Sequence, residues 1–306
     1  DVEAAAVPEA GGAGDGADDL SRATGMINRR ALFPLAAAFA APALPAFAAP
    51  RRTVQLGPHP KQALDLYPTP GLKDAPVLLF VHGGGWSLGD KGAVNALPGY
   101  AARHGFLLAS AGYRLAPEVD AGGCAEDVAL SIAWLSENAA RNGGDPQRIV
   151  IAGHSAGAHL AALVGVDPRY LGDHGRSSKD LAGVICIDGA GYDAPRQMAQ
   201  LAEGGGGPLQ RRLASMYQGA FGARAAELSP TRLVEPGRAY PPFLIFHVER
   251  RADAREQSEG LAAALRAAGG SAEVVSAPGE THRSINVDFG KPGDPEGERA
   301  ALFIRG

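Results

Sequence analysis

A serine between two glycines is the first feature of the chain that suggests chemistry. Ser155 lies in Gly153-His154-Ser155-Ala156-Gly157, after the apolar run RIVI and before HLAALV. A G-x-S-x-G sequence between a strand and a helix is typical of a sharp turn that projects the serine hydroxyl above a sheet. The helix that begins at Ala156 directs its positive end toward the serine, which favours developing negative charge. The pattern predicts a nucleophile, and an ordinary turn of small residues is the alternative.

A serine hydroxyl is a poor nucleophile without a base, and the chain offers eight histidines. His282, in APGETHRSIN, lies in a loop after the last predicted strand, and we predict that it is the base. His82 belongs to a glycine-rich loop that its ring is expected to brace. His154 flanks the serine, and His247 lies in the apolar run FLIFHV, where a core histidine is expected.

The carboxylate that orients the base is expected after the strand 241–248. Glu249 comes directly off this strand, whereas Asp253 follows a short excursion and starts the helix 255–268. Asp253 could also be no more than the N-cap of that helix. We favour Asp253 as the acid, because a helix, a strand and His282 then follow in order. A helix of about 14 residues spans ~21 Å, enough to cross the sheet and return.

A second glycine-rich stretch, HGGGW at 82–86, follows the predicted strand 77–81. Its backbone N–H groups could approach a tetrahedral intermediate closely, so Gly83, Gly84 and Gly85 are predicted oxyanion donors together with the N–H of Ala156. Each such donor is typically worth ~3 kcal/mol in the transition state. A phosphate-binding loop is disfavoured, because neither G-x-G-x-x-G nor G-K-[ST] is present.

The elements that position these residues alternate between strands and helices. Short apolar runs predict strands, and stretches with apolar residues at helical spacing, ended by glycine, predict helices between them. The predicted strands are 77–81, 106–113, 148–155, 181–189, 241–248 and 271–278, and the predicted helices are 97–105, 124–144, 156–165 and 255–270. This alternation indicates βαβ units in a mostly parallel sheet covered on both faces.

Residues 190–240 interrupt this alternation with a glycine run and short helical pieces. A long insertion late in an α/β fold is usually a lid over the site, and the alternative is a surface excursion.

Together, HGGGW, SAGYRLAPE, NGGDPQRIVIAGHSAGAHLAAL and ETHRSIN resemble the α/β-hydrolase superfamily over residues 52–306. Within it they are similar to esterases related to hormone-sensitive lipase, to kynurenine formamidases and to feruloyl or acetyl-xylan esterases. The resemblance implies an α/β-hydrolase fold with an eight-stranded, mostly parallel sheet, and the roles Ser155 nucleophile, Asp253 acid and His282 base. His154 before the serine and Ala158 after the motif are nearer the formamidase-like branch than the lipase-like one.

The implied activity is hydrolysis of small or short-chain carboxylic esters through an acyl-enzyme, with no metal or cofactor. N-formylkynurenine-type amides are the second expectation and peptides the third. A non-catalytic binding module on the same fold is the alternative from another class, since fold does not give function.

The bulk composition is that of a globular protein of 306 residues with a formal charge of −4. Residues 1–25 hold six acids and one base, so the rest of the chain sums to +1. A near-neutral body gives no electrostatic reason to expect nucleic acid as a partner. Two cysteines, Cys124 and Cys186, cannot form a framework, and whether they pair stays open.

The N-terminal region is predicted to contain a targeting signal. Residues 1–25 are rich in Ala, Gly and acids, and are expected to be disordered. Residues 26–48 combine Asn28-Arg29-Arg30, an Ala-rich apolar stretch and Ala46-Phe47-Ala48, which resembles an export signal of the twin-arginine type. Prolines in this stretch disfavour a buried helix. We therefore expect an exported protein, periplasmic or extracellular, with no membrane span in its mature form.

Overall fold

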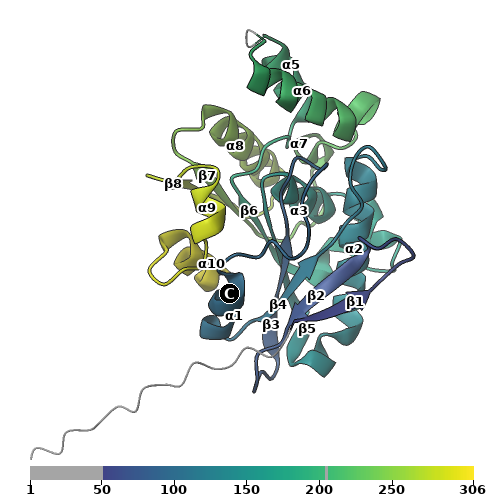
Figure 1. Ribbon diagram of the computed structural model, residues 1–306, viewed down its shortest axis with the longest axis vertical. Helices are drawn as coiled ribbons and strands as arrows, with labels where there is room; N and C mark the ends of the chain where they lie inside the picture. The colour runs from purple at the N-terminus through teal and green to yellow at the C-terminus, as the bar shows by residue number, and fades with distance from the viewer. Residues whose placement is uncertain (1–50, 204–205) are drawn as a thin grey trace, which may run out of the picture. The chain divides into compact units, whose positions relative to one another are not determined.

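Parallel pairings join six of the eight strands, and β5 lies in the middle of the sheet (Figure 1). The computed structural model describes residues 51–203 and 206–306. The spatial order is β1-β2-β4-β3-β5-β6-β7-β8, with β1 and β2 antiparallel at one edge. The strands are Arg52–Gln55 (β1), Ala63–Tyr67 (β2), Ala75–Val81 (β3), Leu107–Ala111 (β4), Gly144–His154 (β5), Leu181–Ile187 (β6), Phe243–Val248 (β7) and Ala272–Ala277 (β8). The predicted α/β class and mostly parallel eight-stranded sheet are confirmed.

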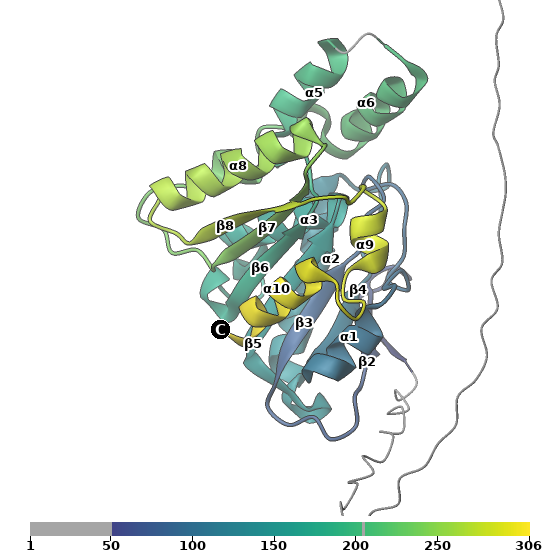
Figure 2. The same cartoon turned by 90° about the vertical axis from the view of Figure 1, so that its left-hand side faces the viewer.

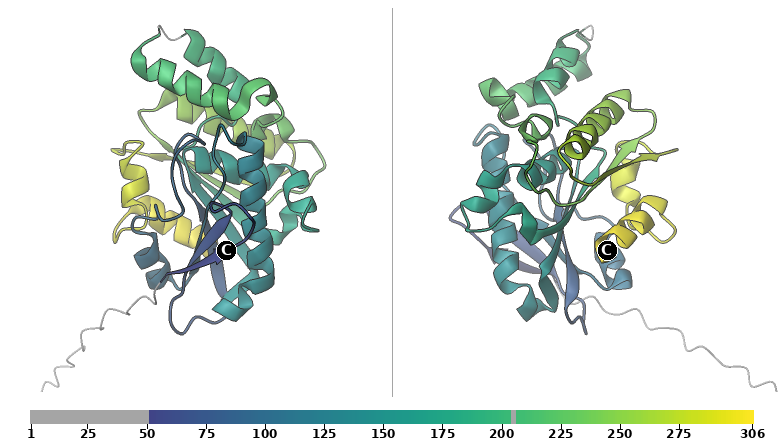
Figure 3. Two further views of the ribbon diagram at one scale, coloured as in Figure 1. Left: turned by 45° about the vertical axis from the view of Figure 1, so that its right-hand side comes forward. Right: turned by 180° about the vertical axis from the view of Figure 1, so that it is seen from behind.

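Helices cover both faces of the sheet (Figure 3). They are Leu97–His104 (α1), Ala121–Asn138 (α2), Ala156–Val166 (α3), Pro168–Gly172 (α4), Ala194–Glu203 (α5), Pro208–Phe221 (α6), Pro230–Leu233 (α7), Ala252–Ala267 (α8), Ser284–Asp288 (α9) and Pro295–Arg305 (α10). Val77 and Leu79 of β3 pack in one core with α2 and α3, while Leu78 and Phe80 pack in the other with α1 and α10. Because both faces are buried, β3 is apolar throughout.

Local signals set several of these boundaries. Asp120 caps α2, its side chain accepting a hydrogen bond from the N–H of Gly123, so the helix begins three residues before the predicted start at 124. The helix ends at Asn138, and a 3-10 turn then leads to Gly143 with φ 82°. The chain is thereby turned into β5, which begins at Gly144.

The insertion 190–240 folds into α5, α6, a 3-10 turn and α7. In Figures 1 and 2 the α5–α6 pair lies beyond one end of the sheet. Four apolar residues of α6 fall at helical spacing and line the cavity described below: Leu209, Leu213, Met216 and Tyr217.

Three further sequence expectations have different outcomes. Cys124 and Cys186 are both buried and free, so they do not pair. The predicted disordered segment 1–25 and export signal 26–48 lie outside the described residues. Among the residues that are described, no helix has the length and apolarity to cross a membrane.

Candidate active site

Ser155 occupies a sharp turn between β5 and α3, with φ 55° and ψ −121°. The two neighbouring glycines are needed for close approach of the backbone. A Cβ at Gly153 would lie 2.2 Å from the carbonyl oxygen of Gly157, and one at Gly157 would lie 2.1 Å from that of Val81. A side chain at 153 would push β5 away from α3, and one at 157 would push α3 away from the end of β3. The glycines therefore permit the strained turn that exposes the hydroxyl.

The loop between β8 and α9 brings His282 to this serine. Its Nε2 lies 3.0 Å from Ser155 Oγ, and its Nδ1 lies 2.6 Å from Asp188 Oδ2. The backbone of His282 is itself held, because Nε2 of His154 lies 2.9 Å from its carbonyl oxygen and donates to it. Burial, and secondly the nearby His282, lower the pKa of His154 to about 3, so this ring is neutral. His154 thus braces the base rather than competing with it.

Asp188 follows directly on β6 and is fully buried. Its φ is 43°, a conformation that aspartate tolerates better than most residues. Oδ1 accepts from the N–H of Val248 at 2.9 Å, and Oδ2 accepts from His282 and from Arg251 Nη1, both at 2.6 Å. Burial alone would raise the pKa of Asp188. The hydrogen bond from His282, the charge of Arg251 and the Val248 N–H outweigh burial and lower it to about 2. The carboxylate is therefore ionised.

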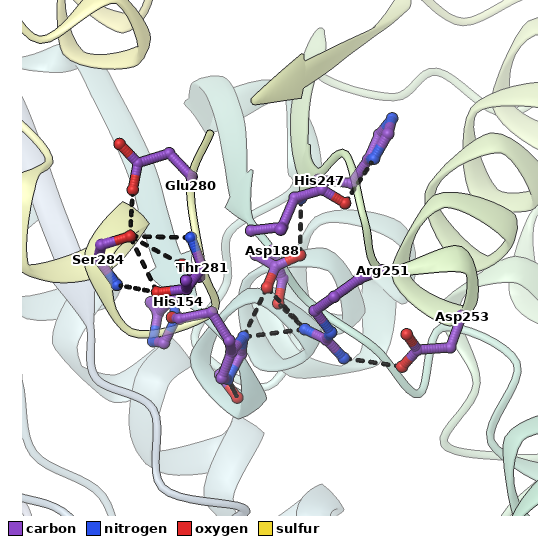
Figure 4. Close-up of polar contacts among 11 residues, drawn as sticks. His154, Asp188, His247, Arg251, Asp253, Glu280, Thr281 and Ser284 are labelled. Atoms are coloured by element: carbon purple, nitrogen blue, oxygen red, sulfur yellow. Dashed lines mark hydrogen bonds and ion pairs between the residues drawn. The ribbon is translucent and has the colours of Figure 1, made fainter. Parts of the chain in front are cut away.

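The structure corrects the choice of Asp253 as the acid. Asp253 lies in the first turn of α8, and its Oδ2 accepts from Arg251 Nη2 at 2.7 Å. Figure 4 shows Arg251 between Asp188 and Asp253. The turn after β7 thus presents a guanidinium to the histidine where a carboxylate was expected, and the exposed Glu249 does not replace it. The carboxylate that reaches the base comes from the preceding strand, β6.

A signal for Asp188 was present in the sequence. LAGVICID is an apolar run that ends in a single charged residue, at the carboxyl end of a predicted parallel strand. Functional residues of open α/β sheets gather at that edge. The prediction that the acid follows the strand 241–248 was therefore wrong by one strand.

The glycine loop after β3 lies against the serine. Gly83, Gly84, Gly85 and Ala156 line one cavity with Ser155. Within residues 51–203 and 206–306, no acceptor is bonded to the backbone N–H groups of Gly83, Gly84 or Ala156. These amides are free to donate to an oxyanion formed at the serine.

One buried aromatic stack and two hydrogen bonds fix the start of this loop. The ring of His82 stacks on Tyr113 at 4.2 Å, and the Tyr113 hydroxyl donates to the His82 carbonyl at 2.8 Å. The ring also bonds the Gly83 carbonyl oxygen at 2.8 Å through Nδ1, so Nδ1 carries the proton. Burial lowers the pKa of His82 to about 4. His82 therefore acts as a neutral brace, as the sequence indicated.

His159 ties the far end of the same loop to the insertion. Its Nδ1 accepts from Trp86 Nε1 at 3.2 Å, and its Nε2 donates to the carbonyl of Leu228 at 2.7 Å. The ring is fully buried, and burial lowers its pKa to about 4. One neutral imidazole thus satisfies the indole N–H and a buried carbonyl at once.

Above the serine lies a cavity of about 700 Å³. Helix α6 and the glycine loop supply most of its apolar wall: Trp86, Leu88, Ala93, Leu209, Leu213, Met216 and Tyr217. Leu88 and Leu209 are 55% and 69% exposed, so the rim is apolar as well. Arg251 also lines the cavity, but both of its terminal nitrogens are bonded to carboxylates. The site therefore suits a substrate with an apolar group more than an anionic one.

Comparisons with known proteins agree with the fold. A family model described as alpha/beta hydrolase fold matches residues 78–286. Esterase LipC of Mycobacterium tuberculosis is 32% identical over 274 residues, which cover 83% of this chain and 64% of that protein. A probable isoprenylcysteine alpha-carbonyl methylesterase of rice is 44% identical over 112 residues, covering 36% of this chain and 26% of that protein. The chain thus spans less than two thirds of these curated relatives.

Among solved structures, a thermophilic esterase of Thermogutta terrifontis superposes with a TM-score of 0.62 at 26% identity. The match covers 83% of this chain and 90% of that one. The similarity thus extends over most of the chain and is not confined to the serine turn.

Proposed function

Since the chain belongs to the α/β-hydrolase fold family, we propose that it is a serine hydrolase that cleaves carboxylic esters through an acyl-enzyme. One observation carries the proposal: a continuous line of hydrogen bonds runs from Ser155 Oγ through both ring nitrogens of His282 to the buried carboxylate of Asp188. Nucleophile, base and orienting acid in this relation activate a serine on many unrelated folds.

The mechanism follows from this geometry. His282 Nε2 takes the proton of Ser155 as the hydroxyl attacks the ester carbonyl. Asp188 keeps the proton on Nδ1, so that Nε2 is free to accept, and stabilises the imidazolium that forms. The free N–H groups of the glycine loop and of Ala156 hold the oxyanion. His282 then protonates the leaving alcohol, and water repeats the two steps on the acyl-enzyme.

The substrate we propose is an uncharged ester with an apolar acyl or alcohol part. The named activities of the relatives, esterase and isoprenylcysteine methylesterase, both concern esters. The apolar wall and rim of the 700 Å³ cavity leave room for more than an acetyl group. The short acyl chains expected from the sequence would fit, and a longer chain would lie along α6.

The test is hydrolysis of p-nitrophenyl acetate, butyrate and octanoate by the full chain, beside Ser155→Ala and His282→Ala. We expect turnover by the wild type and a loss of at least 10³-fold in kcat for both variants. His174→Ala is the matched control, because His174 is exposed and lies outside the cavity. An S-isoprenylcysteine methyl ester and N-formylkynurenine belong in the same panel, to separate esters from formamides. An inert wild type with all of these would favour a binding module.

We also propose that the protein is exported, on the sequence of residues 26–48. Expression in a bacterium should yield periplasmic protein that begins near Ala49. Replacing Arg29 and Arg30 together with lysine should keep the chain in the cytoplasm. Unprocessed cytoplasmic protein from both chains would contradict the proposal.

A further inference from the structure

The turn between β7 and α8 places a guanidinium beside the base. Arg251 Nη1 lies 2.6 Å from Asp188 Oδ2 and 2.8 Å from His282 Nδ1. Asp188 Oδ2 is also 2.6 Å from His282 Nδ1, so the three atoms form a nearly equilateral triangle. An ionised carboxylate can only accept, and both nitrogens therefore direct their hydrogens at the same oxygen.

The other end of the guanidinium is held separately. Arg251 Nη2 donates to Asp253 Oδ2 at 2.7 Å, so Arg251 bridges two carboxylates. Figure 4 shows this chain of contacts from Asp188 through Arg251 to Asp253. The Arg251 side chain is 26% exposed, whereas that of Asp253 is 39% exposed. A planar fork with several fixed donors can satisfy two acceptors at once in this way, which a lysine ammonium does less well.

We propose that Arg251 is a positioning residue of the triad: it clamps Asp188 onto His282, and Asp253 offsets the positive charge that Arg251 brings beside the base. The proposal rests on the serine hydrolase function argued above.

The clamp has a geometric role. Without Arg251, His282 would be the one remaining partner of Asp188 Oδ2, and the Val248 N–H would be the one remaining partner of Oδ1. Removing the second donor leaves the carboxylate freer to rotate. The proton on Nδ1 would then be less strictly oriented, which lowers kcat with little effect on KM.

The charges have a separate role. Arg251 opposes formation of an imidazolium 2.8 Å away, and Asp253 reduces that opposition. The titratable and charged groups that face His282 come from each neighbouring element: His154 at the end of β5, Asp188 after β6, Arg251 before α8, Asp253 in α8, Tyr217 of α6 near the Arg251–Asp253 pair, and Glu280 on its own loop. His154 and Tyr217 are neutral, since burial lowers the pKa of the former and raises that of the latter. Glu280 is bonded to Ser284.

The two substitutions Arg251→Gln and Asp253→Asn should therefore move the acidic limb of the kcat/KM–pH profile in opposite directions. This limb reports protonation of the free enzyme's base. Loss of Arg251 leaves Asp188 unopposed, so the limb should move to higher pH by about one unit or more. Loss of Asp253 unmasks Arg251, so the limb should move to lower pH, by less, because the more exposed Asp253 is better screened by solvent.

The experiment measures kcat, KM and kcat/KM for p-nitrophenyl butyrate between pH 5 and 9.5. Arg251→Gln should also lower kcat about 10-fold or more at the plateau. Arg251→Lys, which keeps the charge, should leave the limb near that of the wild type but still lower kcat. Arg255→Gln is the matched control, since Arg255 is exposed one turn further along α8.

Equal shifts of Arg251→Gln and Asp253→Asn in one direction would overturn the proposal, because general loosening of the loop would then explain both. An Arg251→Gln profile that matches Arg255→Gln would overturn it as well. Should Arg251→Gln fail to fold, the Arg251→Lys and Asp253→Asn profiles still decide. Failure of the hydrolase function itself would look different, because the wild type and Ser155→Ala would then be equally inactive.

Discussion

The identity of the triad acid gives the sharpest prediction, because two aspartates can be removed without changing side-chain shape. Asp188→Asn deletes the buried carboxylate 2.6 Å from His282 Nδ1, and Asp253→Asn deletes the one bonded to Arg251. The first should abolish most of the activity. The second should lower kcat by less than about 10-fold and shift its pH dependence.

The magnitude for Asp188→Asn follows from the charge that develops in the transition state. A unit charge on the imidazole and one on the carboxylate, about 4 Å apart at an effective dielectric constant of about 20, interact by about 4 kcal/mol. Losing that term corresponds to about 10³-fold in rate. Arg251 then remains beside the imidazolium without its partner, and asparagine no longer fixes the tautomer. We therefore expect a loss of about 10³ to 10⁴ in kcat.

The assay is steady-state hydrolysis of p-nitrophenyl butyrate at pH 8 by wild type, Asp188→Asn and Asp253→Asn. Thermal unfolding of each chain shows that the variants are folded. If Asp188→Asn stays within 10-fold of the wild type while Asp253→Asn loses 10³-fold, the reasoning is refuted. Arg251 would then have to move aside in solution and let Asp253 reach the histidine.

Further predictions concern stability and the cavity wall. Gly157→Ala would bring a Cβ to 2.1 Å from the Val81 carbonyl oxygen, a backbone atom that has no room to move, so thermal unfolding should show a loss of about 3 kcal/mol or more, or no folded protein. His159→Leu should cost about 2 to 5 kcal/mol in urea unfolding, because it leaves the Trp86 indole N–H and the Leu228 carbonyl without partners, and a loss below 1 kcal/mol would contradict that role. Leu213→Ala with Met216→Ala should reduce kcat/KM for the octanoate ester about 10-fold more than for the acetate, whereas equal losses would exclude an acyl site along α6. Burial lowers the pKa of His82 and His159 to about 4 and that of His154 to about 3, so below about pH 6.5 the unfolded chain binds protons that the folded chain does not. Urea unfolding should therefore show stability falling as the pH drops from about 6.5 toward 4, and constant stability would contradict neutral burial.

Much of the fold could be read from the sequence because its strands are buried on both faces. Runs such as VLLFV in β3 and VICI in β6 are apolar throughout, which is typical of parallel strands with helices on both faces of the sheet. The first two strands carried no such signal. β1 is a four-residue edge strand that is mostly exposed, and β2 is only five residues long. Pairing with β4, rather than local pattern, makes β2 a strand.

The residues of the site could be predicted where the backbone conformation requires a particular residue type. They could not be predicted where several carboxylates lie near enough to contact the same histidine. The serine turn requires glycine at 153 and 157, and the G-x-S-x-G pattern shows this requirement in the sequence. The choice among Glu249, Asp253 and Asp188 depends on which carboxylate points at His282 across adjacent strands. Arg251 decides which carboxylate contacts the histidine, because its Nη2 binds Asp253 and its Nη1 donates to Asp188. The sequence shows that Arg251 and Asp253 are two residues apart, but it does not show that Arg251 contacts Asp188, which lies 63 residues earlier.

Burial also explains why one histidine among the four around the site is suited to act as the base. His82, His154 and His159 are 2%, 7% and 0% exposed, and each is bonded to a backbone carbonyl as a neutral ring. A ring so placed cannot take up a charge without large cost, because desolvation penalises the imidazolium. The side chain of His282 is 44% exposed, and its Nδ1 is paired with the fully buried carboxylate of Asp188. Of these four rings, only His282 has both the contact with solvent and the counter-charge that a proton-accepting step requires. The three buried rings are better understood as supports: one holds the backbone of the base, and two fix the loop whose amides face the oxyanion.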